Sequence, residues 1–166
     1  MYIYDFIQGL IIGGTLIIAI GPQNLFVIQQ GLKKSYVFTV TLFCSLSDSL
    51  LIVIGIYLSN YIVQINPSII GIIKVLGGIW LIFYGLNKVI KLNQIKDINK
   101  ELNIINEYGK VLITLFLITY ANPHVYLDTI ILLGSLSTNF NDQFSFGIGA
   151  ISASFLFFFS LGYMSK

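Results

Sequence analysis

The chain has 166 residues, a length that would normally indicate one soluble domain. Its composition excludes that class, because only 10% of the residues are charged and 56% are hydrophobic, whereas a soluble domain carries about 25% charged residues. The net charge of +2 comes from lysines and acids without any arginine, which excludes a nucleic-acid-binding protein. A single cysteine, Cys44, excludes a disulfide framework and a cysteine-ligated metal site. The composition therefore predicts an all-α, polytopic membrane protein.

Long apolar runs with few charges predict five membrane-spanning helices. A bilayer span needs about 20 mostly apolar residues. We place the five spans at residues 6–30, 36–59, 68–91, 110–134 and 144–164. The polar stretch at 92–109 predicts a loop. No cleavable signal peptide is expected, because the residues before the first apolar run include the acid Asp5 and no lysine.

The lysines predict how the chain is oriented in the membrane. Every lysine except Lys74 falls on one side of the predicted spans: after the first span, around the loop at 92–109, or after the fifth span. The positive-inside rule makes that side cytoplasmic. We therefore expect a cytoplasmic loop at 92–109, an N-terminus outside the cell and residue 166 inside.

Two similar halves predict an internal repeat. Gly21-Pro22 in the first span has a counterpart in Asn122-Pro123 in the fourth, and a proline at such a place removes a helix hydrogen bond. The Ser-x-Ser pair at 47–49 in the second span has a counterpart at 152–154 in the fifth. A repeat of three spans reverses its orientation across the membrane, which is the plan of many secondary transporters.

The repeat divides the single transmembrane domain, residues 1–166, into a first repeat at 1–91, the loop at 92–109 and an incomplete second repeat at 110–166. We therefore expect a 3+3 inverted-repeat transporter fold. The counterpart of the third span would begin beyond residue 166, so the last helix is expected to be absent. The alternative is that these prolines only kink their helices and the serines only fill tight helix contacts.

Ionisable residues at membrane depth are costly, so their first interpretation is functional. Asp48 lies near the middle of the second span and Lys74 lies inside the third. Either the two residues pair, or Lys74 extends to the outer surface and leaves Asp48 for a cation. Asp128 follows His124 by four positions and so shares its helix face. A solvated carboxylate near the outer end of the span is the alternative for Asp128.

Polar residues beside the two breaks are further candidates for the substrate pathway. Gln23, Asn24 and Asn122 can bind a substrate or cap the backbone groups that the breaks leave free. His124 can take up a proton during transport or bond to a carbonyl in the helix packing. One histidine without a nearby cysteine or second acid gives no metal site. We expect neither a metal, nor a cofactor, nor an enzyme activity.

Together these parts suit a substrate that carries both charges. Half-helix N-termini after Pro22 and Pro123 would present free N–H groups to a carboxylate. Asp48 and Asp128 would meet an ammonium or guanidinium group. The expected partners are thus a small amino acid and the lipid bilayer, and a homo-oligomer is left open.

Glycines and aromatic residues near the breaks can serve helix packing or substrate binding. Gly9 and Gly13, four positions apart, predict a face for close helix contact. Several aromatic residues can form the walls of a site, bind a cation or face lipid. These are Tyr120, Tyr126, Phe155 and Phe157–Phe159.

Four segments resemble the lysine/arginine exporter family (LysE type), most closely its arginine exporter branch. They are residues 21–27 with 30–31, then 44–48, 122–129 and 151–156, in the order and spacing of the family. The string Asn-Pro-His-Val-Tyr-Leu-Asp at 122–128 is specific to it. Gly-Pro-x-Asn at 21–24 is shared with exporters of neutral amino acids and homoserine.

The resemblance implies a multi-pass inner-membrane secondary transporter that exports L-arginine or related basic amino acids such as lysine or canavanine. It puts Asn24, Asp48, Pro123 and Asp128 at the family's polar and helix-breaking positions. Members of the family have a sixth hydrophobic segment, which this chain lacks. The alternatives are therefore a truncated member that is inactive in transport, and an exporter of neutral amino acids or homoserine.

Overall fold

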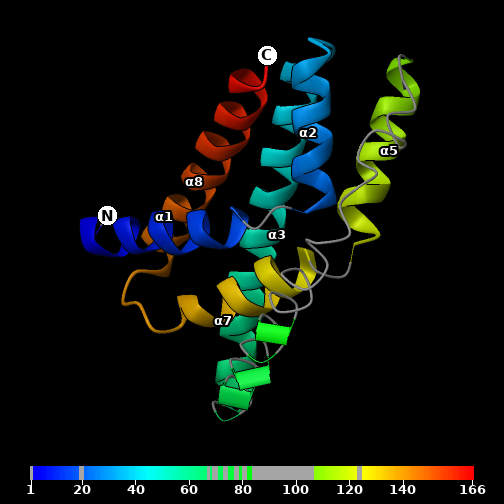
Figure 1. Cartoon of the computed structure of the whole chain (residues 1–166). Coiled ribbons are helices and arrows are strands. Elements are labelled where there is room, and N and C mark those ends of the chain that lie inside the picture. Colours follow the sequence, from blue (N-terminus) through cyan, green and yellow to red (C-terminus); the bar gives the residue numbers. More distant parts are fainter. Residues whose placement is uncertain are drawn as a thin grey trace.

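The computed structural model describes residues 2–18, 21–66, 68, 71–72, 75–76, 79, 82–83, 107–122 and 125–166. Every regular element in these residues is a helix (Figure 1), which confirms the all-α prediction for this part of the chain. The predicted span at 68–91 and the loop at 92–109 fall largely outside the described residues. Lys74, Pro123 and His124 lie outside them altogether.

The first predicted span consists of two helices that differ strongly in direction. Helix α1 (Ile3–Ile17) and helix α2 (Pro22–Leu32) lie at 83° to each other. Pro22 is the first residue of α2, where a missing N–H costs no helix hydrogen bond. Gly21 before it is extended, with φ −110° and ψ 179°. The Gly-Pro pair thus starts a new helix rather than kinking a continuous one.

Two helices are long and apolar enough to cross a bilayer by themselves. They are α3 (Val37–Ile65) and α8 (Gln143–Met164), and they match the second and fifth predicted spans. Asp142 caps the start of α8 by accepting hydrogen bonds from the hydroxyl and the N–H of Ser145. These two bonds lower the pKa of the Asp142 carboxyl.

The fourth predicted span is also interrupted. Helix α5 (Tyr108–Tyr120) ends before a break, after which the π-helix η2 (Tyr126–Leu133) continues directly into α7 (Gly134–Ser137). In a π-helix each N–H bonds to the carbonyl five residues back, a geometry that is rare and often found at functional sites. The two halves of the chain therefore share one order of elements: helix, break, helix, turn and long helix.

The counterparts in the two halves pack on corresponding helices but to different extents. Helix α1 packs extensively along α8 and touches η2, whereas its counterpart α5 makes only a small contact with α3 and α2. The inverted repeat therefore stays a prediction, although the shared order of elements agrees with it.

Glycines let helix backbones touch between α1 and α8 and between α3 and η2. A Cβ on Gly13 of α1 would lie 2.9 Å from the Cα of Ala150 in α8, and one on Gly9 would overlap the carbonyl of Phe146. A Cβ on Gly55 of α3 would lie 2.7 Å from the carbonyl oxygen of Thr129 in η2. Gly9 and Gly13 thus form the predicted close-packing face, and η2 is held against α3 by a similar contact.

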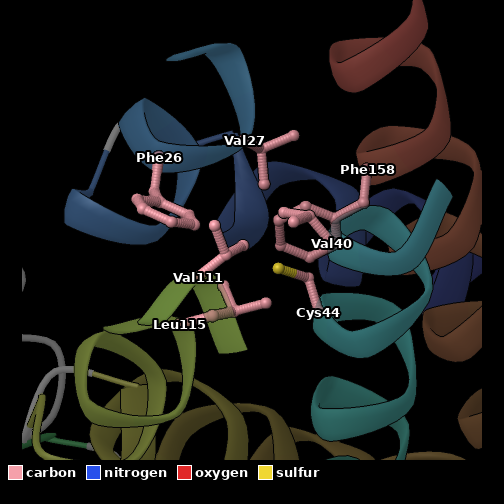
Figure 2. Close-up of a cluster of buried hydrophobic side chains, with 7 residues drawn as sticks. All are labelled: Phe26, Val27, Val40, Cys44, Val111, Leu115 and Phe158. Carbon is pink, nitrogen blue, oxygen red and sulfur yellow. The ribbon is translucent and has the colours of Figure 1, made fainter. Parts of the chain in front are cut away.

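The buried apolar side chains form two clusters along α3. The first cluster joins α2, α3, α5 and α8 (Figure 2) and consists of Phe26, Val27, Val40, Cys44, Val111, Leu115 and Phe158. The second joins α3, η2 and α8 and consists of Ile52, Leu133, Phe146 and Ala150. On α3, Cys44, Asp48 and Ile52 are spaced by four residues and so share one face. Asp48 therefore lies between the two apolar clusters.

The lysines in the described residues lie at one end of the helix bundle. Figure 1 shows the end of α2, the start of α3, the start of α5 and the end of α8 at the top of the view. These helix ends carry Lys33, Lys34, Lys110 and Lys166. The rings of Tyr36 and Tyr108, whose centroids are 5.1 Å apart, join the starts of α3 and α5 there. The arrangement agrees with the predicted cytoplasmic side.

The N-terminal residues lie at the opposite end of α8. The N–H of Tyr2 donates a hydrogen bond to the hydroxyl of Ser145 at 3.1 Å. The N–H of Asp142 donates to the buried carboxylate of Asp5 at 2.8 Å. The N-terminus and Lys166 therefore lie at opposite ends of this helix, as the charge pattern predicts.

Candidate functional site

A cavity of about 60 Å³ lies where the two broken regions approach the middle of α3. Space of this size admits several water-sized groups. That is enough for the polar head of a small ligand. Apolar walls are supplied by Leu16, Ile52, Leu133 and Phe158, which come from α1, α3, η2 and α8.

Most residues that the sequence singles out for a substrate pathway line this one cavity. They are Gln23 and Asn24 of α2, Asp48 of α3, Asn122 in the second break and Asp128 of η2. Gly21, from the first predicted helix break, lines it as well, and Pro22 begins the adjoining helix. The positions of His124, Pro123 and Lys74 lie outside the described residues.

Asp48 is the most buried acid of the cavity. Its side chain is 4% exposed, and its Oδ2 atom accepts a hydrogen bond of 3.1 Å from the hydroxyl of Ser154 on α8. Apolar clusters lie on both sides of it along α3. A carboxylate in such surroundings is costly unless a cation or proton joins it.

Asp128 reaches the same cavity from the other half of the chain. Its side chain is half-buried and its Oδ1 atom is buried. The next residue, Thr129, also lines the cavity, and its hydroxyl donates to the carbonyl of Val125 at 2.6 Å. Asp128 therefore faces the space shared with Asp48, which favours the binding interpretation over a carboxylate in open solvent.

The two amide side chains at the start of α2 differ in their contacts. The Nδ2 of Asn24 donates to the carbonyl of Ile17, the last residue of α1, at 3.1 Å. Asn24 thus caps α1 while it lines the cavity. The Nε2 of Gln23 is buried and has no oxygen or nitrogen partner among the described residues. Capping accounts for the amide of Asn24, whereas the Gln23 side chain interacts with the buried thiol of Cys44. A primary amide has two N–H donors, so one of them remains for another molecule.

The charges around the cavity are of one sign. Asp48 and Asp128 line it, and none of its lining residues in the described part of the chain is basic. Two carboxylates in one partly apolar space attract a cation, because the attraction is screened less there than in water.

Some residues of the site are not evident from the sequence. The apolar walls have no distinguishing signal, since leucine and isoleucine also face lipid. Ser154 is noted only as half of a repeated pair, and its contact with Asp48 spans 106 positions. Of the aromatic residues singled out above, Phe158 lines the cavity, whereas Tyr120 and Tyr126 form hydrogen bonds beside the second break.

Relatives of this chain are transport proteins. The arginine exporter ArgO of Klebsiella pneumoniae strain 342 is 36% identical, over 99% of this chain and 79% of its own length. ArgO of Escherichia coli K12 is 35% identical over the same shares. ArgO of Enterobacter sp. strain 638 is 33% identical, over 96% of this chain and 77% of its own length. No solved structure matches the chain.

The family model described as LysE type translocator matches residues 15–166, which is nearly the whole chain. The four segments that resemble this family include Gly21, Asn24, Asp48, Asn122 and Asp128, all of which line the cavity. The chain therefore belongs to the LysE family of translocators, and it is a multi-pass membrane transporter rather than an enzyme.

Proposed function

We propose that the chain exports basic amino acids across the inner membrane, with L-arginine as the main substrate and lysine and canavanine as further ones. The observation that carries this proposal is the pair of carboxylates, Asp48 and Asp128, in one cavity without a basic lining residue in the described part of the chain. The relatives that are named arginine exporters support it.

The two charged ends of the substrate bind to different walls. Asp48 and Asp128 bind the guanidinium or ammonium group, since charge-assisted hydrogen bonds to carboxylates are strong. The substrate carboxylate binds at the N-terminus of α2, where no side chain caps the helix and the helix dipole favours a negative charge. The buried amide nitrogen of Gln23 adds a donor on the same side.

Export is secondary transport, driven by the membrane potential or the proton gradient. The cavity lies between two apolar clusters that follow each other along α3. Separation of one cluster at a time would open the site to one side of the membrane. A 3+3 inverted repeat would relate the two openings, as it does in other secondary transporters.

Replacement of Asp48 tests the proposal most directly. We expect Asp48→Asn to reduce arginine efflux at least about 30-fold, because loss of one partner of a buried charge pair costs about 2 kcal/mol or more. Efflux is measured from arginine-loaded proteoliposomes and normalised to the inserted protein. Asp142→Asn is the matched control, since Asn also caps a helix and this position lies outside the cavity. It should keep efflux within about twofold of the parent chain.

Competition between substrates separates this proposal from its alternatives. Excess lysine or canavanine should inhibit arginine efflux, and excess threonine should not. Normal arginine efflux by the Asp48→Asn variant contradicts the role of Asp48. Threonine efflux without arginine efflux by the parent chain contradicts the substrate class.

A further inference from the structure

Two tyrosine hydroxyls connect the second break to the Asp48 region of α3. The hydroxyl of Tyr126, the first residue of η2, donates to the carbonyl oxygen of Tyr120 at 2.6 Å. The hydroxyl of Tyr120, the last residue of α5, donates in turn to the hydroxyl oxygen of Ser47 on α3 at 3.1 Å. Two hydrogen bonds, one at the carbonyl and one at the hydroxyl of Tyr120, thus connect η2 to the end of α5 and the end of α5 to α3.

These two bonds lie directly behind the candidate site. Ser47 precedes Asp48 in α3, and Tyr126 is two residues before Asp128 in η2. None of the three hydrogen-bonding residues is among those that line the cavity. They do not contact the substrate in this arrangement, so their effect on it acts through the residues that do.

The bond of Tyr126 also closes the break itself. A break leaves the last carbonyls of α5 without helix partners, and the Tyr126 hydroxyl supplies a donor to one of them. Asn122, which lines the cavity, lies within the segment that this bond spans. The position of the Asn122 and Asp128 side of the cavity is therefore tied to the Tyr126 hydroxyl.

Ring contacts hold Tyr120 independently of its hydroxyl. Its ring centroid lies 4.8 Å from that of Phe116 on its own helix and 6.4 Å from that of Phe43 on α3. A phenylalanine at this position would keep both contacts and lose only the bond to Ser47. The structure thus allows the hydrogen bond to be removed without removing the packing.

We propose that Ser47, Tyr120 and Tyr126 are positioning residues that set Asn122 and Asp128 against Asp48 across the cavity. This positioning role depends on the proposed function only in that arginine is taken as the substrate. We call Ser47, Tyr120 and Tyr126 the tyrosine relay. Its two hydrogen bonds hold η2 against the end of α5 and the end of α5 against α3. Loss of either tyrosine hydroxyl lets the second broken helix shift relative to α3 and weakens substrate binding.

The test compares Tyr→Phe variants of the full chain in proteoliposomes. Tyr120→Phe and Tyr126→Phe should each raise KM for arginine about three- to tenfold, the range expected for one lost hydrogen bond, with a smaller change in Vmax and only a small decrease in thermal stability in detergent. Tyr163→Phe, at the lysine end where the ring stacks on Phe159, is the control and should stay within about twofold.

Ser47 provides a second, independent comparison. Ser47→Ala should raise KM as Tyr120→Phe does, and the double variant should be no worse than either single one, since both changes remove the same bond. Ser47→Thr keeps the hydroxyl and should restore the parent KM. Unchanged KM in both tyrosine variants overturns the proposal. Parallel losses of Vmax and thermal stability at unchanged KM also overturn it, since they indicate a purely structural role.

A cross-linking rate tests the positioning role without relying on arginine as the substrate. In a Cys44→Ala background, cysteines at Ile52 and Val125, which both line the cavity, are joined by a short bis-maleimide, each thiol adding across one maleimide double bond. Tyr126→Phe should change the cross-linking rate at least about threefold, the factor that one weak hydrogen bond gives. If the parent chain does not transport arginine, the proposed function fails and this rate alone decides the relay. An unchanged rate overturns the relay.

Discussion

Two serines on α8 show how strongly the role of a residue depends on its contacts. The hydroxyl of Ser152 donates to the carbonyl of Ile148 on its own helix at 2.8 Å. The hydroxyl of Ser154 donates instead to the Oδ2 of Asp48 on α3 at 3.1 Å, and both of these side chains are buried. Helix α8 thus acts on the site through Ser154, which fixes one oxygen of the buried carboxylate.

Ser154→Ala should weaken arginine binding, because the freed carboxylate oxygen is then buried without its donor. We expect KM in proteoliposomes to rise about three- to tenfold, as for one lost hydrogen bond. Ser152→Ala removes a hydroxyl from the same helix without touching Asp48, and its KM should stay within about twofold. Equal effects of the two substitutions would show that Ser154 has no special role.

At the scale of helices, the positions of the breaks could be predicted from the sequence, but their geometry could not. Pro22 and Pro123 mark both interruptions, since proline removes a hydrogen bond in the interior of a helix but is tolerated where a helix begins. The 83° angle after the first break depends on where α1 and α2 find partners. Those partners are distant in sequence, as the contact of Gly13 with Ala150 shows. A local pattern carries no information about them.

The close contact of α3 with η2 predicts a marked effect of one added methyl group. Gly55→Ala places a Cβ 2.7 Å from the Thr129 carbonyl oxygen, so a helix must move. We expect a loss of about 1–3 kcal/mol in unfolding free energy, measured by circular dichroism in detergent. Gly109→Ala is the control, since its Cβ meets nothing within 4 Å. A Gly55→Ala chain as stable as that control would mean that η2 does not pack so closely on α3.

At the scale of the whole molecule, the sequence singles out the polar residues that line the cavity and Phe158, but not its aliphatic walls. Asp48, Asp128 and the amides stand out because polar groups are rare at membrane depth. Leu16, Ile52 and Leu133 line the same cavity, yet their side chains resemble those that face lipid. Only the packing of α1, α3 and η2 against one another distinguishes the two kinds of apolar position.

The two ends of α8 should react from opposite sides of the membrane. Single cysteines at Asn141 and Lys166 in a Cys44→Ala background are labelled with a membrane-impermeant maleimide in whole cells. The lysine pattern places residue 166 in the cytoplasm, so only the cysteine at Asn141 should react. Reaction of only the other cysteine would reverse the orientation, and reaction of both would contradict a single crossing by α8.

The thiol of Cys44 makes the opening of the first apolar cluster measurable. Cys44 is the only cysteine of the chain, its side chain is fully buried, and Figure 2 shows its sulfur among side chains from α2, α5 and α8. A thiol in this place reacts with a soluble reagent only while these helices are apart. Its rate of modification therefore reports how often the bundle opens toward its lysine end, in a chain without any substitution.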